Sequence, residues 1–559
     1  MINQLLLPDE PFLLEDAQKL ASQSLDFALL VTGGLSEESW KSIYSILDEL
    51  ARALKKGGIL FVQGLPSQLP SLGVYLDQKL KFKYWIVLES TRRDFTKGLP
   101  SVHSGVLMYV KGNTFAVNKV RVPHEYCFAC GRTLKDWGGK AHLMNPSGAA
   151  ISDVWKSLEG EDNYSSLGVT FYQRLLKMVD IDEKEMSGWA APKNALPIPQ
   201  TKGMIKESKI AYQPNLFSIL QTVNSDDQPE DQNKEFPGFN VILQGDALEV
   251  LKKYPDESID LVFADPPYNL DKSYNVYNDE LATKEYLDWC NQWLDEYIRI
   301  LKPTGSLFVL NLPHWSMYHA DYLNKRLYFQ NWIVWDALSE PRGKLMPAHY
   351  SLLFYTKQKE GFTFNYEGLK NLDSRVYCLR ASCVRSRKSR GENKQEPLTD
   401  LWWDIHRIKH RRDRDYHPCQ LPEGLLKRII LLTTNPNDVV LDALAGTGTT
   451  IITAAKLGRQ FVGIDIDPYY VELMQRKLKQ IQVNGEIIRT PSKRTKTGLT
   501  KKELQLELRS LAKRLGRLPT PEDVKMYSQF DLKVYLDVFP TWGKAIKAAK
   551  LEIVDDKNG

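Results

Sequence analysis

The chain contains two copies of one segment, and this repeat limits its possible folds more than any other feature. Residues 50–66 and 297–313 are identical at nine of 17 positions without a gap, at an offset of 247 residues. The same offset relates Trp85-Ile86-Val87 to Trp332-Ile333-Val334 and Asp153 to Asp400, and an offset of 246 relates His103 to His349. Because order and spacing persist over about 100 residues, chance similarity between two amphipathic stretches is a poor explanation. The first part of the chain is therefore expected to be a diverged copy of a later part.

Composition bounds the class of protein. The 559 residues correspond to three or four domains, at about 150 residues each. Hydrophobic residues make up 43% and charged residues 26%, which excludes disordered, collagen-like and small disulfide-stapled proteins. The net charge is 74 − 69 = +5, so positive charge for a nucleic acid must be concentrated locally. Six cysteines are too few for a disulfide framework and fit a reducing compartment.

The sequence shows no membrane or export signal. No apolar run reaches the roughly 18 residues that a membrane helix needs. The first residues, MINQLLLPDEPFLLEDAQ, lack a basic segment and carry acids early, unlike a secretory signal. We therefore expect a cytoplasmic protein with no membrane partner.

Apolar runs alternate with helical patterns in the second half of the chain. IDLVFA, GSLFVL, SLLFYT and QFVGIDI are short and bounded by turn residues, and helical stretches such as 283–301 and 468–481 lie between some of them. This rhythm predicts a largely parallel α/β sheet. The expected organisation is an α/β copy at 1–221, a linker at 222–238, an α/β domain at 239–485, a linker at 486–498 and a helical module at 499–559.

The tetrapeptide Asp265-Pro266-Pro267-Tyr268 directly follows the strand-like run at 259–264. Ligands of open α/β sheets bind at the carboxyl ends of strands. The two prolines stiffen the loop and hold the carboxylate and the aromatic ring in a fixed relation. An acceptor beside a flat aromatic face suits recognition of a planar ring that bears an amino group. The alternative is a turn that only ends the strand.

A second motif combines a strand at 438–444 with a glycine-containing loop at 445–450 and an apolar helix. Gly446 and Gly448 permit a tight turn and close approach of the backbone to a ligand. Asp465 ends the next strand, where an acid can bind the ribose hydroxyls of an adenosine-containing ligand. The pattern is neither G-x-G-x-x-G nor a phosphate-binding loop, so a nicotinamide dehydrogenase is a distant alternative.

The tetrapeptide at 265–268, the HPCQLP segment at 417–422, the loop DALAGTGTT and the following GIDID together resemble the amino-methylating DNA methyltransferases. The catalytic motif precedes the cofactor loop, as in the beta subgroup. The resemblance covers residues 239–485. It implies a Rossmann-like methyltransferase fold, S-adenosyl-L-methionine as cofactor, double-stranded DNA as substrate and, in restriction-modification systems, a cognate restriction endonuclease as partner.

The resemblance also implies roles for particular residues. Asp265 and the carbonyl of Pro266 would accept hydrogen bonds from the two N–H groups of the target amine in the loop stiffened by Pro267, and Tyr268 would stack on a flipped-out base. Adenine N6 is the favoured target; cytosine N4 and a catalytically silent DNA-binding scaffold remain as alternatives. The residues implied to bind the cofactor are Asp246, Asp442, Ala445, Gly446, Gly448, Thr449 and Asp465.

Positive charge is concentrated at residues 375–414, with 12 Lys or Arg and five Asp or Glu, a net charge of 12 − 5 = +7. The family places its target-recognition insertion between the catalytic motif and the cofactor loop, as here. Such a run can neutralise phosphates, although it can also be a solvated surface. The candidate DNA-binding residues are Arg385, Arg387, Lys388, Arg390, Arg411 and Arg412.

The C-terminal module, residues 499–559, has apolar residues at helical spacing with breaks at Gly516 and Pro519. It resembles the small helical repeat associated with homing endonucleases. We expect it to be an accessory DNA-binding module, with dimerisation or simple packing as the alternative. The matching residues are Leu515, Gly516, Arg517, Pro519, Thr520, Phe539, Trp542, Ala548 and Ala549.

The first copy lacks the catalytic motif. Aligned on the repeat, Val31 takes the place of Asp265 and Gly34 that of Tyr268, and no glycine-rich loop follows Trp155. We therefore expect a degenerate copy that braces the active one, so that a monomer acts as a pseudo-dimer, or a homodimer forms.

Cys127 and Cys130 form a CxxC motif, a spacing that zinc sites use. No complete set of four ligands is evident around them, and the corresponding pair, Cys378 and Cys383, is spaced differently. We expect ordinary buried thiols and no metal, with zinc as the alternative.

Overall fold

A computed structural model gives the fold over most of the chain. None of the helices in this part is both long enough and apolar enough to cross a membrane. The predicted linker at 486–498 lies outside the described residues, as does the predicted linker at 222–238 up to residue 235. The structure describes residues 2–95, 98–134, 142, 144–156, 163–179, 185–197, 236–269, 281–337, 345–378, 380–392, 394–408, 420–484, 501–528, 530–539, 541–549 and 551.

The second α/β part contains one large sheet. Its strands are β10 (Val241–Gln244), β11 (Ile259–Ala264), β12 (Leu301–Asn311), β13 (Tyr328–Asp336), β14 (His349–Thr356), β17 (Leu401–Trp402), β18 (Val439–Asp442) and β19 (Gln460–Asp465). Their order is β10-β19-β18-β11-β12-β14-β13-β17. Neighbouring strands are parallel except where β14 pairs with β12 and β13. The predicted largely parallel sheet is confirmed.

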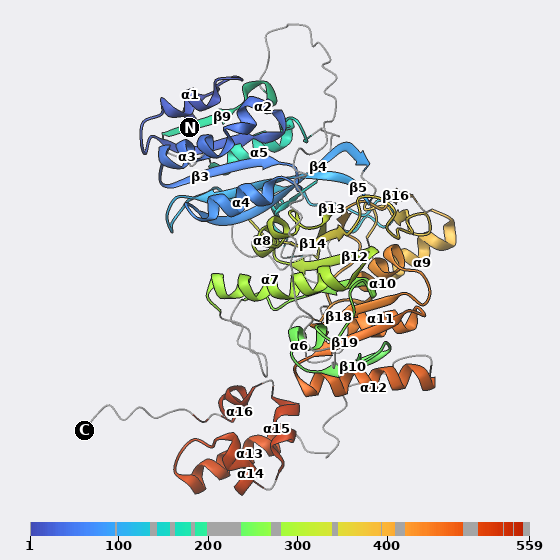
Figure 1. Cartoon of the computed structure of the whole chain (residues 1–559). Helices are drawn as coiled ribbons and strands as arrows, with labels where there is room; N and C mark the ends of the chain where they lie inside the picture. The colour runs from blue at the N-terminus through green and yellow to red at the C-terminus, as the bar shows by residue number, and fades with distance from the viewer. Residues whose placement is uncertain are drawn as a thin grey trace, which may run out of the picture. The chain divides into compact units, whose positions relative to one another are not determined.

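Helices cover both faces of this sheet (Figure 1). They are α6 (Ala247–Leu251), α7 (Thr283–Ile300), α8 (Pro313–Leu323), α10 (Glu423–Thr433), α11 (Thr449–Lys456) and α12 (Pro468–Asn484). Because side chains alternate along a strand, Val262 of β11 joins a core with α6, α7 and α8, whereas Phe263 joins a core with α10, α11 and α12. Because the central strands are buried on both faces, their sequences are continuous apolar runs.

The first α/β part contains its own seven-stranded sheet. Its elements are β1 (Ile2–Leu6), α1 (Leu13–Gln18), β2 (Leu25–Val31), η1 (Thr32–Gly34), α2 (Glu37–Lys41), α3 (Ile43–Ala53), β3 (Leu54–Gly64), α4 (Leu69–Asp77), β4 (Lys81–Phe95), β5 (Pro100–Val110), β6 (Arg121–Val122), β7 (Ala149–Ala150), β8 (Val154–Trp155), α5 (Val169–Val179), β9 (Met186–Ala191) and η3 (Lys193–Ala195). The sheet order is β1-β9-β2-β3-β5-β4-β8.

The two sheets share one topology. The run β9-β2-β3-β5-β4-β8 of the first sheet matches β18-β11-β12-β14-β13-β17 of the second. Corresponding ion pairs support the match, since Lys55 lies 2.7 Å from Asp26 and Lys302 lies 2.7 Å from Asp260. The expectation of a diverged α/β copy before the methyltransferase-like fold is confirmed.

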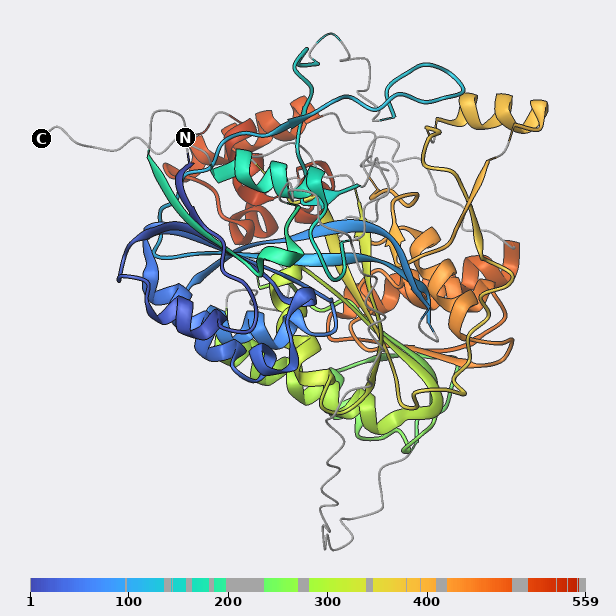
Figure 2. The same cartoon turned by 90° about the horizontal axis from the view of Figure 1, so that it is seen from above.

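The two copies dock reciprocally within one compact unit. His103 Nδ1 of the first copy lies 3.1 Å from Asp400 Oδ2 of the second, and His349 Nδ1 lies 3.0 Å from Asp153 Oδ2. The repeat pairs His103 with His349 and Asp153 with Asp400, so each contact has its symmetry mate. Helix α4 of the first copy also lies beside α8 of the second (Figures 1 and 2). The arrangement within the chain is that of a symmetric dimer.

The C-terminal helices form a separate compact unit. They are α13 (Lys501–Leu515), α14 (Pro521–Tyr527), α15 (Leu532–Val538) and α16 (Trp542–Ala548), around a small core of their own. The predicted breaks occur where expected: Gly516 follows α13 with a φ of 66°, and Thr520 and Asp523 form a capping box at the start of α14.

Candidate functional site

Four parallel strands end side by side at one edge of the second sheet. Strand β11 leads into Asp265, β18 ends at Asp442, β19 ends at Asp465 and β10 leads toward Asp246. From β11 the chain continues to β12 toward one edge of the sheet, and from β18 it continues to β19 toward the opposite edge. The sheet therefore has a topological switch point between β11 and β18, where open α/β sheets bind ligands.

The Asp265–Tyr268 loop is held by hydrogen bonds from the helices and strand beside it. The Tyr268 hydroxyl donates to Asp265 Oδ1 at 2.7 Å, and Trp315 Nε1 donates to the carbonyl of Tyr268 at 2.8 Å. The buried Tyr286 hydroxyl donates to the carbonyl of Pro267 at 2.7 Å and accepts from Asn311 Nδ2 at 3.1 Å. The carboxylate and the ring are thus fixed relative to each other, as the two prolines predict.

Aromatic side chains continue from Tyr268. Its ring centroid lies 5.9 Å from that of Tyr350, which lies 5.2 Å from that of Trp335. The Tyr350 hydroxyl accepts a hydrogen bond from Arg407 Nη1 at 3.1 Å. This aromatic cluster packs beside the Tyr268 ring, for which the family resemblance implies base stacking.

The glycine loop after β18 depends on its glycine backbone. Gly446 and Gly448 have φ values of 50° and 75°, in the left-handed region that disfavours other residues. A Cβ on Gly448 would lie 2.3 Å from Met474 Cγ. The buried Lys477 donates to the carbonyl of Thr447 at 2.8 Å and fixes the turn from the α12 side.

Two carboxyl groups beside this loop are strongly influenced by burial. Burial raises the pKa of Asp442 to about 7, although the Thr450 hydroxyl donates to it at 2.6 Å and favours the ionised form. Burial also raises the pKa of Asp465, against the hydrogen bonds that Asp467 and Gly446 donate from their backbone N–H groups. A cation bound nearby would favour the ionised form of both carboxyl groups.

The strand ends and loops enclose a cavity of about 260 Å³. Every predicted catalytic and cofactor-binding residue except Gly448 lines it, so the structure brings together residues that are up to 219 positions apart in the chain (465 − 246). Acids line it, but no lysine or arginine does among the residues with described positions. This lining suits a ligand carrying a sulfonium cation better than one carrying a pyrophosphate. The lining includes Asp246, Asp265, Pro266, Pro267, Tyr268, Asp442, Ala445, Gly446, Thr449 and Asp465.

Comparison with known proteins identifies the family. Residues 259–476 match the N6/N4 family described as DNA methylase, and residues 499–552 match the homing endonuclease associated repeat. DNA adenine methyltransferase YhdJ of Escherichia coli is 34% identical over 244 residues, which cover 42% of this chain and 82% of that protein. The chain belongs to the S-adenosylmethionine-dependent N6/N4 DNA methylase family.

Two further proteins are similar to this DNA methylase over comparable lengths. Type II methyltransferase M.BamHI of Bacillus amyloliquefaciens is 39% identical over 284 residues, and the match spans 49% of this chain and 63% of that protein. The solved structure titled PvuII DNA methyltransferase (cytosine-N4-specific) is 20% identical, with a TM-score of 0.32, over 43% of this chain and 86% of that chain.

Sequence reasoning missed several residues of the methylase cavity. Trp289 reaches it from α7, Ile466 from the position directly after β19, Tyr470 from α12 and Gln420 from the segment before α10. The sequence offered one signal for Ile466, since an apolar residue directly follows the strand-ending acid Asp465. In the structure Ile466 is 50% exposed. The contribution of α7 depends on tertiary packing and left no motif.

The predicted DNA-binding residues do not share one environment. Helix α9 (Ala381–Arg390), which lies between the short strands β15 (Asn371–Asp373) and β16 (Gln395–Pro397), exposes Arg385, Lys388 and Arg390. Arg387 is fully buried, with its guanidinium 4.3 Å from the Tyr377 ring centroid. Its assignment as a phosphate contact is therefore withdrawn, because a buried cation cannot reach a phosphate. Arg411 and Arg412 lie outside the described residues.

The corresponding edge of the first copy is filled by protein. A Cβ on Gly33 would lie 1.8 Å from the carbonyl oxygen of Tyr164, and one on Gly34 would lie 2.7 Å from Ala195 Cβ. Strand β9, the counterpart of β18, runs into Pro192 and η3 (Lys193–Ala195). The chain thus packs against itself where the second copy opens its cavity, consistent with the expected loss of chemistry.

The cysteines require a correction. The sequence interpretation found no four-ligand set, but the structure brings the sulfur atoms of Cys127, Cys130, Cys378 and Cys383 within 4.8 Å of one another. Each copy supplies two of these cysteines, and the two pairs meet only because the copies dock. The sequence pattern therefore could not reveal the four-cysteine cluster.

Proposed function

We propose that this methylase transfers a methyl group from S-adenosylmethionine to N6 of an adenine flipped out of double-stranded DNA. The observation that carries the proposal is the shared cavity, in which Asp265 and Tyr268 face the same space as Gly446 and Asp465. One wall offers an acceptor and a ring for a base, and the other offers a glycine turn and an acid for an adenosine-containing cofactor.

The residues of this chain would act by positioning and by electrostatics. When bound, the cofactor supplies an electrophilic methyl group. Asp265 and the carbonyl of Pro266 would each accept a hydrogen bond from one N–H of the amine and turn its lone pair toward that methyl group, and one of these two protons would leave after transfer. The Asp265 carboxylate would stabilise the positive charge that develops on the nitrogen, held in place by the Tyr268 hydroxyl. Neither a metal nor a covalent enzyme intermediate is required for this route.

Adenine is favoured over cytosine because the motif is Asp-Pro-Pro-Tyr and because the relative YhdJ is named an adenine methyltransferase. Arg385, Lys388 and Arg390 of α9 are proposed to contact the phosphates, and the C-terminal helices to bind DNA as an accessory module. A cognate restriction endonuclease fits the names of the type II relatives.

The test uses the purified full-length chain, unmethylated DNA and tritiated S-adenosylmethionine. The DNA is digested to nucleosides, and the label is expected in N6-methyladenine for the wild type and in no nucleoside for Asp265→Ala. Label in N4-methylcytosine would overturn the choice of base. Cofactor binding without transfer to any DNA would instead support the silent scaffold. Isothermal titration with S-adenosylmethionine should give near-normal affinity for Asp265→Ala, and a single site per chain.

A further inference from the structure

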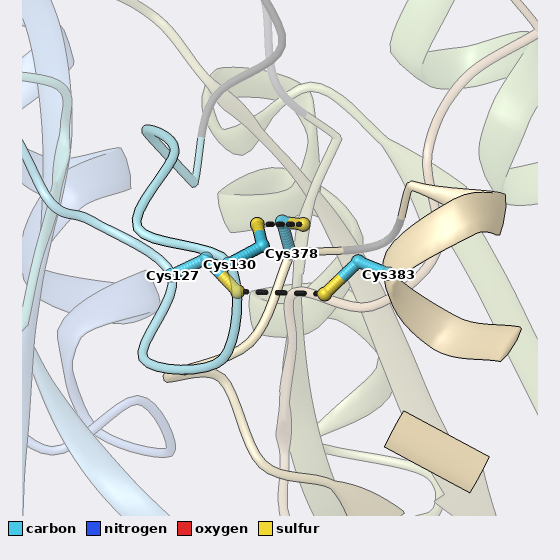
Figure 3. Close-up of side chains that lie close together, drawn as sticks. All are labelled: Cys127, Cys130, Cys378 and Cys383. Carbon is cyan, nitrogen blue, oxygen red and sulfur yellow. Dashed lines mark hydrogen bonds between the residues drawn. The ribbon is translucent and has the colours of Figure 1, made fainter. Parts of the chain in front are cut away.

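Four cysteine side chains from the two copies converge at one point outside the methylase cavity (Figure 3). Cys127 and Cys130 lie in the segment after β6, and Cys378 and Cys383 lie just before and on α9. The Cys127 and Cys383 sulfurs are 3.7 Å apart, as are those of Cys130 and Cys378. Three of the four residues are buried.

The spacing of the sulfur atoms fits one tetrahedral ion. Zinc–thiolate bonds of about 2.3 Å in a tetrahedron place neighbouring sulfurs about 3.8 Å apart. A disulfide instead requires about 2.05 Å, so the sulfurs are not bonded in pairs. The chain spacings, C-x2-C at 127–130 and C-x4-C at 378–383, are those that structural zinc sites use.

The backbone presents the first pair on a tight turn. The N–H of Cys127 donates to the carbonyl of Arg132 at 2.6 Å, and the N–H of Gly131 donates back to the carbonyl of Cys127 at 2.8 Å. Gly131 has a φ of 66°, and Tyr126 bridges to Thr133. This turn directs both sulfurs of the CxxC motif to the same side (Figure 3).

The charges around the cluster agree with a metal–thiolate centre. Four thiolates and one divalent ion carry a net charge of −2, which is costly to bury without a cation nearby. The fully buried Arg387 follows Cys383 by one helical turn and stacks on Tyr377, the neighbour of Cys378. A dianionic centre one helical turn away would stabilise the buried guanidinium of Arg387.

We propose that Cys127, Cys130, Cys378 and Cys383 bind one structural Zn²⁺. With four protein ligands the site is closed, so it has no open position for catalysis. The ion would join the first copy to α9, where Arg380 also donates to the carbonyl of Thr133 at 2.7 Å. It would thereby hold α9 in a fixed position. This proposal about the metal does not rest on the proposed function.

The test measures zinc in the full-length chain purified without chelators from zinc-supplemented cells. Elemental analysis should give one zinc per chain, released when a mercurial reagent modifies the thiols. Cys130→Ser and Cys378→Ser should lose most of the zinc and unfold at a lower temperature. The matched control is Cys290→Ser, because Cys290 is a buried thiol of α7 outside the cluster and its loss should leave the zinc content at one.

A second measurement keeps the test decisive if the serine variants fail to fold. Replacement of the metal in the wild type by Co²⁺ should give the intense visible absorption of a tetrahedral thiolate site. Wild-type protein with substoichiometric zinc after supplementation, and no such spectrum with Co²⁺, would overturn the proposal. So would a non-reduced, denatured mass lower by four hydrogen atoms, because two disulfides would then join the four sulfurs.

Discussion

Trp85 stacks on Trp332 with the ring centroids 4.0 Å apart and the ring planes within 10° of parallel. These two residues occupy the same position in the two copies of the repeat, so the pair lies where an internal two-fold axis would pass. The His103–Asp400 and His349–Asp153 contacts repeat around it. The degenerate copy has therefore kept the residues of the interface while losing those of the chemistry.

The stacked pair should account for much of the stability of this interface. Trp332→Ala is expected to lower the free energy of unfolding by about 3–5 kcal/mol, because it leaves a large cavity between the copies. The loss of unfolding free energy in the double variant should differ from the sum of the losses in Trp85→Ala and Trp332→Ala by about 0.5–1.5 kcal/mol, which is the energy of a direct aromatic pair. Denaturant titration measures both, with the 59% exposed Phe12→Ala as a near-neutral control. Full additivity would contradict direct coupling.

Tyr286 is expected to position the catalytic loop through Pro267. Tyr286→Phe removes the hydroxyl that links Asn311 to the Pro267 carbonyl. We expect kcat to fall about tenfold, equivalent to about 1.4 kcal/mol, while KM for the cofactor stays nearly unchanged. Tyr322→Phe, which removes a hydrogen bond to the exposed Asp295, is the control and should leave kcat unaltered. A rise in cofactor KM without a change in kcat would disprove positioning of the base-binding loop.

Gly448 should not tolerate a side chain. Gly448→Ala places a Cβ against Met474 at a φ of 75°, so the glycine loop must shift. We expect a loss of cofactor affinity of about tenfold or more, together with reduced stability. Calorimetric titration measures the affinity, and Gly424→Ala serves as control because nothing lies within 4 Å of its Cβ in α10. Unchanged affinity in Gly448→Ala would show that the loop does not shape the cofactor site.

Asp442 should make stability depend on pH. Its pKa is raised by burial to about 7, so between about pH 4 and 7 the unfolded chain loses this proton while the folded chain keeps it. The folded state therefore binds more protons, and its stability should fall as pH rises through this window and level off above it. Asp442→Asn should remove this component. Urea titrations of both proteins from pH 5 to 8.5 measure it, and parallel curves would refute the shifted pKa.

The exposed side of α9 should contact phosphates and the buried side should not. Substitution of Arg385 and Lys388 by glutamine is expected to make the salt dependence of DNA binding less steep, by about 0.9 in the log–log slope per lost contact, without a change in thermal stability. Arg387→Gln should instead reduce thermal stability, because Arg387 is buried. Fluorescence anisotropy at several salt concentrations measures the slope. An unchanged slope in the double variant would show that the exposed side of α9 contacts solvent and not DNA.

Local sequence patterns predicted most of the fold because they depend on neighbours along the chain. The run at 259–264 is a strand, the stretch predicted at 283–301 is α7 at Thr283–Ile300, and the stretch predicted at 468–481 begins α12 at Pro468–Asn484. The candidate site followed from two motifs, since parallel strands that are neighbours in a sheet must end at the same edge. Arg387 shows the limit of this reasoning, because a basic run does not reveal which of its residues faces the interior.

The sequence alone determined the repeat, the strand and helix rhythm, and the order of the methylase motifs, because these are properties of spacing along one chain. Tertiary structure alone decided how the copies dock, and therefore which residues far apart in the chain meet. Cys127 and Cys383 are 256 positions apart, and their sulfurs come within 3.7 Å only because one copy packs on the other. Contacts across such an interface depend on the shape and burial of both surfaces, which no local pattern in the sequence records.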